Sequence, residues 1–179
     1  MKKYFILILL LINIIPANAL DKFQVTLSSC VDGDTAKFIV EDKVQSTRFL
    51  AIDTPESTIE KEEFGYIASD YTCNLLKNAK EIELELDSNS DKYDRYNRLL
   101  AWVWVDGSLL QKDIISKGYA EVAYLYGDYK YTTELQGAME IAKNNKVGMW
   151  SKSNENSDIY VWLLIIIVAI IIKKLRKRK

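Results

Sequence analysis

The stretch RFLAIDTPES, residues 48–57, puts an arginine before a short apolar run and several oxygen-bearing side chains behind it. The apolar residues 49–52 are typical of a strand that packs on a core. Pro55 restricts the residue before it to an extended backbone, so the strand is expected to end here. The polar side chains that follow the run are Asp53, Thr54 and Glu56.

Arg48 and Asp53 do not meet if this strand simply continues. Strand alternation puts them on opposite faces, about 16 Å apart along the chain axis. Arg48 and Asp53 can belong to one site only if the chain turns between them. We expect that turn at Asp53, because nearby Pro55 favours the end of the strand there. Taken alone, the stretch is also consistent with an ordinary strand end.

The composition limits what such a site can do. The chain has 179 residues, 49% of them hydrophobic, which suits one globular domain with extensions. Histidine is absent, which excludes an imidazole base and leaves zinc only cysteine or carboxylate ligands. Residues 20–157 carry 16 Lys and Arg against 24 Asp and Glu, a net charge of −8. An acidic domain is not an obvious binder of polyanions, so any such function needs local evidence.

The N-terminal residues 1–19 read MKKYFILILLLINIIPANA. Two lysines, an apolar run and a small-residue end follow the order of a secretory signal peptide, with cleavage expected after Ala19. An uncleaved anchor helix is the alternative. A signal of this kind predicts export of the domain that follows.

The C-terminal residues 159–172 form an apolar run, and the basic tail 173–179 follows it. As a helix the run is roughly 21 Å long, short for a hydrocarbon core of about 30 Å. Interfacial Tyr160 and Trp162 and the basic tail favour a membrane anchor with its C-terminus in the cytoplasm. A buried core helix is the weaker alternative, since the run is apolar all round. Residues 152–158 are the expected linker.

Between these ends, residues 20–151 are the expected domain. Hydrophobic periodicity predicts strands, a helix, more strands and two further helices. The expected strands lie within 21–52, around a turn at 41–43 with a return strand over 46–52, and at 81–86 and 99–105. The expected helices cover 64–75, 109–117 and a segment capped by Thr132 or Thr133, the latter with Gln136 in a capping box. This order favours a small antiparallel barrel of the α+β type.

Three stretches can carry chemistry: VDGDT (31–35), RFLAIDTPES (48–57) and DKYDRYNR (91–98). Alone, they are consistent with a turn, a strand end and a solvated loop. Arginine outside the basic tail is confined to the last two stretches, although lysine is used freely elsewhere; these arginines are Arg48, Arg95 and Arg98. Guanidinium geometry suits phosphate better than ammonium does.

Taken together, the three stretches resemble the staphylococcal nuclease (thermonuclease) family. The resemblance includes the fourteen-residue step from Asp34 to Arg48 and DRYNR directly before an apolar strand. It extends to EFGYIASDYTCNLLKNAKEIELELD, GYAEVAYLYGDYKY and the final GMW, and covers about residues 21–151. DKYDR and DRYNR overlap, and distance to the strand selects Arg98 over Arg95 as the family's arginine.

This resemblance implies a five-stranded OB-fold-like β-barrel with three α-helices, and Ca²⁺-dependent hydrolysis of DNA and RNA to 3′-phosphates. The metal ligands would be the carboxylates of Asp34 and Asp53 and the carbonyl of Thr54. The catalytic residues would be Glu56, acting on water, and Arg48 and Arg98, binding the scissile phosphate. The substrate-binding residues would be Arg95, Tyr96, Tyr124 and Tyr126.

The chemistry of these side chains agrees with the implied roles. Carboxylate and carbonyl oxygens suit Ca²⁺, and planar guanidiniums suit the charge that builds on phosphate oxygens. A carboxylate base such as Glu56 explains how a chain without histidine could activate water. Two departures are a loop after Glu56 about three residues shorter than in the type member, and the acidic domain.

Two cysteines, Cys30 and Cys73, complete the expectations. In an exported chain the pair most simply forms a disulfide, and two buried thiols are the alternative. We therefore expect an exported, membrane-tethered, monomeric nuclease for single-stranded or denatured DNA and RNA. The alternatives are a non-catalytic OB-fold module that binds nucleic acid and a structural envelope protein.

Overall fold

The computed structural model describes residues 22–57, 62–152 and 163–168. The predicted signal peptide and basic tail lie outside these ranges, as does most of the predicted linker. Of the predicted anchor, residues 163–168 are described, and they are helical. None of the helices in the described ranges has the length and hydropathy that a bilayer crossing requires.

The larger sheet has the strand order β1-β6-β7-β4-β3-β2, with β8 beside β7. Its strands are β1 (Phe23–Gln24), β2 (Thr26–Cys30), β3 (Thr35–Val40), β4 (Lys43–Phe49), β6 (Ile82–Glu85), β7 (Leu99–Val105) and β8 (Ser108–Leu109). The β4–β7 pairing is parallel and the other pairings are antiparallel. A second, two-stranded sheet pairs β5 (Ile52–Asp53) with β9 (Glu121–Val122).

The α+β, OB-like class is confirmed, but the predicted five-stranded barrel is not. The described residues form nine strands, and no ladder closes the larger sheet by joining β1 to β2. These two strands follow each other through Val25, whose N–H donates to the carbonyl of Ile82 at 2.9 Å. On one side of Val25 the chain pairs with β6 as β1, and on the other side it pairs with β3 as β2. The switch between pairing strands divides what would otherwise be one continuous strand.

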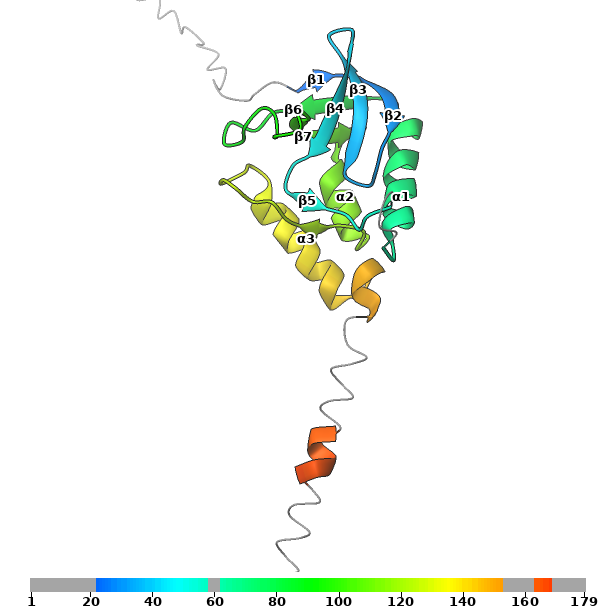
Figure 1. Cartoon of the computed structure of the whole chain (residues 1–179), viewed down its shortest axis with the longest axis vertical. Helices are drawn as coiled ribbons and strands as arrows, with labels where there is room; N and C mark the ends of the chain where they lie inside the picture. The colour runs from blue at the N-terminus through cyan, green and yellow to red at the C-terminus, as the bar shows by residue number, and fades with distance from the viewer. Residues whose placement is uncertain (1–21, 58–61, 153–162, 169–179) are drawn as a thin grey trace, which may run out of the picture.

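Helices cover the sheets on the side and below (Figure 1). They are α1 (Gly65–Asn78), α2 (Leu110–Ser116), α3 (Thr132–Asn144) and the 3₁₀ helix η1 (Gly148–Lys152). Helix α1 packs beside β2, and α2 packs against both β7 and α3. The three predicted α-helices are confirmed, each within a few residues of its expected bounds.

The predicted cap of the last helix is wrong. Helix α3 begins at Thr132, its N-cap residue is Tyr131, and no side-chain hydrogen bond caps it. The Tyr131 hydroxyl instead donates to the carboxylate of Glu85, at 3.0 Å to Oε2. The chain thus enters α3 from a loop that a buried carboxylate holds, and this long-range contact sets the start of the helix.

The strand predicted at residues 81–86 forms over Ile82–Glu85. The alternation of EIELEL predicts an outward Glu85, and the structure buries it. Its side chain is only 2% exposed, and its carboxylate accepts hydrogen bonds from Trp104, Lys130 and Tyr131. Asp87, also buried, accepts from Trp102 Nε1 at 2.9 Å and from the N–H of Lys130 at 2.8 Å. The two carboxylates fasten the segment before α3 to the sheet.

Candidate active site

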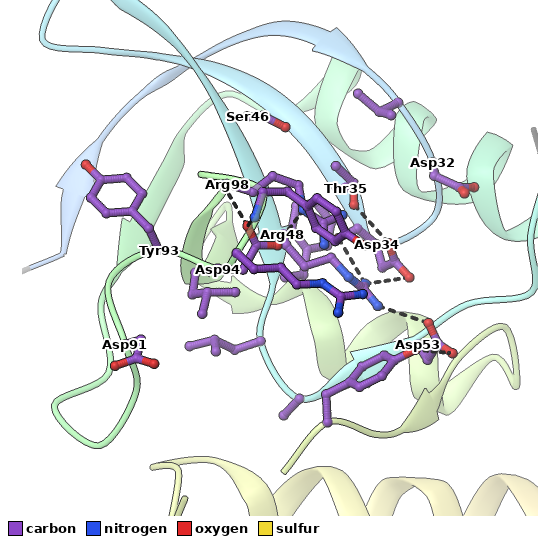
Figure 2. A pocket seen from close by; sticks show the side chains of 18 of the residues that line it. Asp32, Asp34, Thr35, Ser46, Arg48, Asp53, Asp91, Tyr93, Asp94 and Arg98 are labelled. Carbon is purple, nitrogen blue, oxygen red and sulfur yellow. Dashed lines mark hydrogen bonds and ion pairs between the residues drawn. The ribbon is translucent and has the colours of Figure 1, made fainter. Parts of the chain in front are cut away.

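A groove of about 860 Å³ opens between β3, β4, the loop at residues 91–98 and the segment at 124–129 (Figure 2). All but one of the residues expected to handle metal, water or substrate line it: Asp34, Arg48, Asp53, Glu56, Arg95, Tyr96, Arg98, Tyr124 and Tyr126. The exception, Thr54, is buried directly behind Asp34. The fold therefore gathers residues that are up to 92 positions apart in the chain.

The turn that brings Arg48 to Asp53 lies earlier than expected. Strand β4 ends at Phe49, and the chain reverses at Ala51, whose φ is +62°, and not at Asp53. A left-handed backbone at a residue other than glycine costs about 1 kcal/mol or more and needs support from its surroundings. The N–H of Leu50 donates to Ala101 on β7, and the carbonyl of Ala51 accepts from Ala123 beside β9. Both neighbouring sheets therefore fix this turn.

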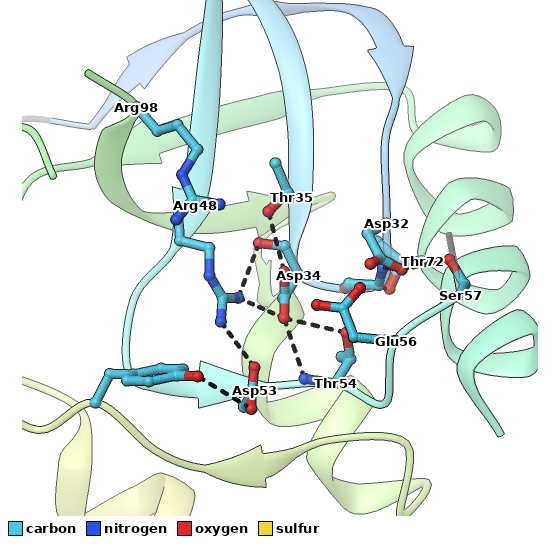
Figure 3. Close-up of polar contacts among 12 residues, drawn as sticks. Asp32, Asp34, Thr35, Arg48, Asp53, Thr54, Glu56, Ser57, Thr72 and Arg98 are labelled. Atoms are coloured by element: carbon cyan, nitrogen blue, oxygen red, sulfur yellow. Dashed lines mark hydrogen bonds and ion pairs between the residues drawn. The ribbon is translucent and has the colours of Figure 1, made fainter. Parts of the chain in front are cut away.

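Arg48 joins two carboxylates (Figure 3). Its Nη1 lies 2.5 Å from Asp34 Oδ2, and its Nη2 lies 2.9 Å from Asp53 Oδ1. The Tyr124 hydroxyl donates to the other oxygen of Asp53 at 3.3 Å, and the Tyr124 ring centre lies 5.4 Å from Arg48 Cζ. The Arg48 side chain is only 12% exposed, so water screens its charge little and its main electrostatic partners are the carboxylates of the groove.

Asp34 is held from behind by Thr54. The N–H and hydroxyl of Thr54 both donate to Asp34 Oδ2 at 3.1 Å, and the Thr35 hydroxyl donates to Oδ1 at 3.0 Å. The family resemblance gives Thr54 a role through its carbonyl. The structure adds a second role, because the same residue orients a carboxylate that Arg48 also binds.

Further carboxylates surround Glu56. Asp32 was not assigned a role from the sequence, although it belongs to the VDGDT stretch; it lines the groove and accepts from the Ser57 hydroxyl at 2.6 Å. Partial burial raises the pKa of Glu56, and the negative charges of Asp32, Asp34 and Asp53 raise it further. Burial also raises the pKa of Asp53, more than neighbouring Arg48 lowers it. Four carboxyl groups thus lie at this end of the groove and Arg48 pairs with two of them, so the cluster has an excess of negative charge.

Arg98 is oriented by Asp94, a residue that the sequence did not single out. Arg98 Nε donates to Asp94 Oδ2 at 2.6 Å, and the backbone N–H of Arg98 donates to Oδ1 at 2.9 Å. Burial alone would raise the pKa of Asp94, but the hydrogen bonds from Arg98 and Tyr96 outweigh it, and the pKa is lowered. The centre of the Tyr96 ring lies 4.7 Å from Arg95 Cζ and 5.4 Å from Arg98 Cζ, so both guanidiniums contact one aromatic ring.

The donor set fits a hard divalent cation. In the described parts of the chain, no three carboxylate or cysteine side chains converge tightly enough to hold a metal by themselves. Asp34 and Asp53 nevertheless converge on one positive group, the guanidinium of Arg48. Ca²⁺ accepts carboxylate, carbonyl and water oxygens together. Two carboxylates with a backbone carbonyl and solvent therefore suit such an ion, and the local excess of negative charge favours it.

Helix α1 holds the loop that carries Asp34. The structure has a disulfide between Cys30, at the end of β2, and Cys73 on α1, with the Cα atoms 5.7 Å apart. The neighbouring Thr72 donates to the carbonyl of Gly33 at 2.8 Å. A Cβ at Gly33 would lie 2.8 Å from side-chain atoms of Thr54, so the close approach requires glycine. Formation of the disulfide in the protein in solution stays a prediction.

Comparisons with known proteins identify the family of the chain. The sequence model of the family described as "Staphylococcal nuclease homologue" matches residues 46–152. The chain is 38% identical over 134 residues to Endonuclease YncB of Bacillus subtilis, covering 73% of this chain and 63% of the relative. It is also 38% identical to the SPbeta prophage-derived endonuclease YokF of the same organism, over 75% of this chain and 46% of the relative.

A staphylococcal relative is similar over most of its own length. The chain is 32% identical to the Thermonuclease of Staphylococcus hyicus over 124 residues, 68% of this chain and 72% of the relative. The chain therefore belongs to the staphylococcal nuclease family. It spans less than two thirds of the length of the two Bacillus relatives.

Proposed function

We propose that this protein is an endonuclease that hydrolyses phosphodiester bonds of DNA and RNA in the presence of Ca²⁺ and leaves 3′-phosphates. One observation carries the proposal: Arg48 bridges Asp34 and Asp53 in the same groove that Glu56 and Arg98 line. Family membership and three relatives named as nucleases support it. A protein that only binds nucleic acid has no need of this combination of acids and guanidiniums.

Asp34, Asp53 and the carbonyl of Thr54 would hold the cation. When bound, Ca²⁺ supplies Lewis-acid polarisation of the phosphate and a template for its position. Arg48 already lies beside both carboxylates, so a phosphate at this position is within reach of its guanidinium. Arg98, aligned by Asp94, supplies a second planar donor. Two guanidiniums stabilise the negative charge that grows on the equatorial oxygens during attack.

Glu56 is the candidate base. Its raised pKa makes the carboxylate a better proton acceptor than an ordinary glutamate, and it lines the groove with Asp34. Glu56 accepts a proton from water as the water oxygen bonds to phosphorus. The bond from phosphorus to the 5′ oxygen breaks, and that oxygen takes a proton from solvent as it leaves. The phosphate then stays on the 3′ side of the cut.

The tyrosines favour an unpaired strand as substrate. Tyr124 and Tyr126 lie side by side, with ring centres 6.4 Å apart, and both are more than half exposed. Tyr96 is similarly exposed on the opposite loop. Aromatic faces stack on unpaired bases with little regard to sequence, which supports action on both single-stranded or denatured DNA and RNA.

We also propose that the protein is exported and anchored in the cell membrane as a monomer. Residues 1–19 have the charged, apolar and small-residue segments of a signal peptide in the expected order. Residues 159–172 are an apolar run followed by a basic tail, as in a membrane anchor. In this arrangement the nuclease domain lies outside the cell and the tail 173–179 lies in the cytoplasm. Protease digestion of intact cells, followed by detection of both ends of the protein, tests this topology.

Replacement of Glu56 by glutamine tests the catalytic proposal. We expect Glu56→Gln to lower the rate of cleavage of denatured DNA by about 10²- to 10⁴-fold, because the base is lost while the shape is kept. The measurement is product formation by the full-length chain in mild detergent, with Ca²⁺ and with a chelator. Glu41→Gln, in the exposed β3–β4 turn, is the matched control and should leave the rate unchanged.

Three outcomes would contradict the proposal in different ways. Full activity of Glu56→Gln would remove Glu56 from the mechanism. Binding of DNA by the unaltered chain without any cleavage in Ca²⁺ would favour a non-catalytic binding protein. Cleavage that persists in the chelator would exclude the cation.

A further inference from the structure

The loop before β7 contains two consecutive triplets of the same kind. Asp91-Lys92-Tyr93 is followed directly by Asp94-Arg95-Tyr96. Asp94, Arg95 and Tyr96 belong to the site described above, whereas the first triplet has no assigned role. Both Tyr93 and Tyr96 line the groove.

The structure gives the two triplets the same pairing. Lys92 Nζ lies 5.5 Å from the ring centre of Tyr93, and Arg95 Cζ lies 4.7 Å from that of Tyr96. The Tyr93 side chain is 41% exposed, so part of its ring is free to meet a ligand. In Figure 2, Tyr93 lies on the opposite side of the pocket from Asp53, on the loop that also carries Asp94. A ligand that reaches both must extend along the groove.

The backbone under Tyr93 is fixed. Tyr93 forms an isolated antiparallel bridge with Leu99, and the carbonyl of Lys92 accepts from Leu100 at 3.0 Å. The N–H of Asp94 donates to the carbonyl of Arg98, also at 3.0 Å. A ring on a fixed backbone loses little freedom when a ligand stacks on it, so more of the contact energy contributes to binding.

Charge is divided along the groove in a way that suits a polyanion. At one end lie Asp32, Asp34, Asp53 and Glu56, of which Asp34 and Asp53 pair with Arg48; this acidic cluster suits a bound cation. The remaining charged residues of the lining are Lys37, Arg95, Arg98, Asp91 and Asp94. Because Asp94 is paired with Arg98, the remainder is two positive side chains, Lys37 and Arg95, and one carboxylate, Asp91. The domain is acidic as a whole, yet the groove lining outside the acidic cluster has a small excess of positive charge.

We propose that Tyr93 forms an additional nucleotide subsite, at which a base of single-stranded DNA or RNA stacks on the ring while Lys92 lies near the adjoining phosphate. This inference rests on the proposed function and deepens it, because it assigns a substrate of several nucleotides. A strand cut beside Asp34 and Asp53 continues past Tyr96 to Tyr93. Longer strands then bind more tightly than a dinucleotide, and the gain depends on the ring of Tyr93 and not on its hydroxyl.

The test is a binding titration of the full-length chain in mild detergent, with a chelator present so that no strand is cut. The probes are a fluorescein-labelled thymidine strand of about ten nucleotides, within the range that one OB fold covers, and a labelled thymidine dinucleotide. We expect Tyr93→Ala to weaken binding of the longer strand at least about fivefold, the lower end of the effect of one stacked base. Tyr93→Phe should retain the affinity.

Tyr66→Ala is the matched control, because Tyr66 is 77% exposed on α1 and is not among the groove residues. It should bind both probes as the unaltered chain does. The subsite proposal is overturned if Tyr93→Ala binds the longer strand as tightly as the unaltered chain does. It is also overturned if Tyr93→Phe loses as much affinity as Tyr93→Ala, or if Tyr93→Ala loses as much affinity for the dinucleotide as for the longer strand. Cleavage by the unaltered chain in Ca²⁺ is measured separately, so failure of the proposed function is distinguishable from failure of the subsite.

Discussion

Reduction of the bond between Cys30 and Cys73 should destabilise the domain and loosen the loop that carries Asp34. The bond joins the last residue of β2 to α1, and the VDGDT loop begins at the next residue. Thr72, next to Cys73, donates to the carbonyl of Gly33 in that loop. Removing the bond therefore removes one of two adjacent links between α1 and the site.

The size of the effect follows from the sequence separation of 43 residues. In the loop-closure treatment, a crosslink of this span lowers the entropy of the unfolded chain by an amount equivalent to about 4 kcal/mol at room temperature. Native disulfides removed from small domains cost about 2–5 kcal/mol. Since a domain has only about 5–15 kcal/mol in total, we expect a loss of about 2–4 kcal/mol, a large share of the stability.

The assay is urea unfolding of the full-length chain at constant detergent concentration, followed by tryptophan fluorescence. Trp102 is fully buried, so unfolding changes its surroundings completely. The free energy of unfolding is compared with and without reductant, and with the double variant Cys30→Ser/Cys73→Ser. That variant should match the reduced protein and should not respond to reductant.

Two results would refute this reasoning. Labelling of both cysteines by a thiol reagent in unreduced, unfolded protein would show that the bond is absent. If the bond is present but its reduction changes the free energy of unfolding by less than about 1 kcal/mol, the loop-closure argument is wrong for this chain.

Two further variants separate catalysis from stability. Asp94→Asn should lower the cleavage rate about tenfold, since Arg98 loses its oriented partner. Folding lowers the pKa of Asp94, so its ionised carboxylate stabilises the domain above pH 3.8, and this stabilisation is lost as the pH falls through the lower folded pKa. The variant and the unaltered chain should therefore become closer in unfolding free energy towards acid. A gap between them that widens towards acid would contradict this. Glu85→Gln should cost about 2–4 kcal/mol by urea unfolding, because the buried carboxylate accepts from Lys130 and two other donors. Glu83→Gln, a partly exposed residue of the same strand, should cost less than about 0.5 kcal/mol, and equal losses would place the effect elsewhere.

Several parts of the fold were predictable because local interactions decide them. The apolar run at residues 99–105 forms β7, and the Asp106-Gly107 pair turns with positive φ at both residues. The spacing that predicted a helix over 64–75 forms α1, whose inward face includes Ala68 and Leu76. In each case neighbouring residues fix both the backbone conformation and the face that is buried.

The site was predictable in its membership but not in its geometry. The resemblance of three motifs to the staphylococcal nuclease family named Asp34, Arg48, Asp53 and Arg98 as partners in one site. It did not show that the chain reverses at Ala51, because an alanine has no local preference for a left-handed backbone. Hydrogen bonds from two neighbouring sheets impose that conformation, and none of those partners is close in sequence.

The sequence by itself determined the class of the fold and most of the helices and strands, because these follow from hydrophobic periodicity. The resemblance of its motifs to a known family named the chemical groups that line the groove. The tertiary structure alone decided which carboxylates share Arg48, that Asp94 orients Arg98, and that Glu85 is buried. Those outcomes depend on distances between atoms far apart along the chain. Such distances are set only when the strands pair and the core packs, so no local pattern records them.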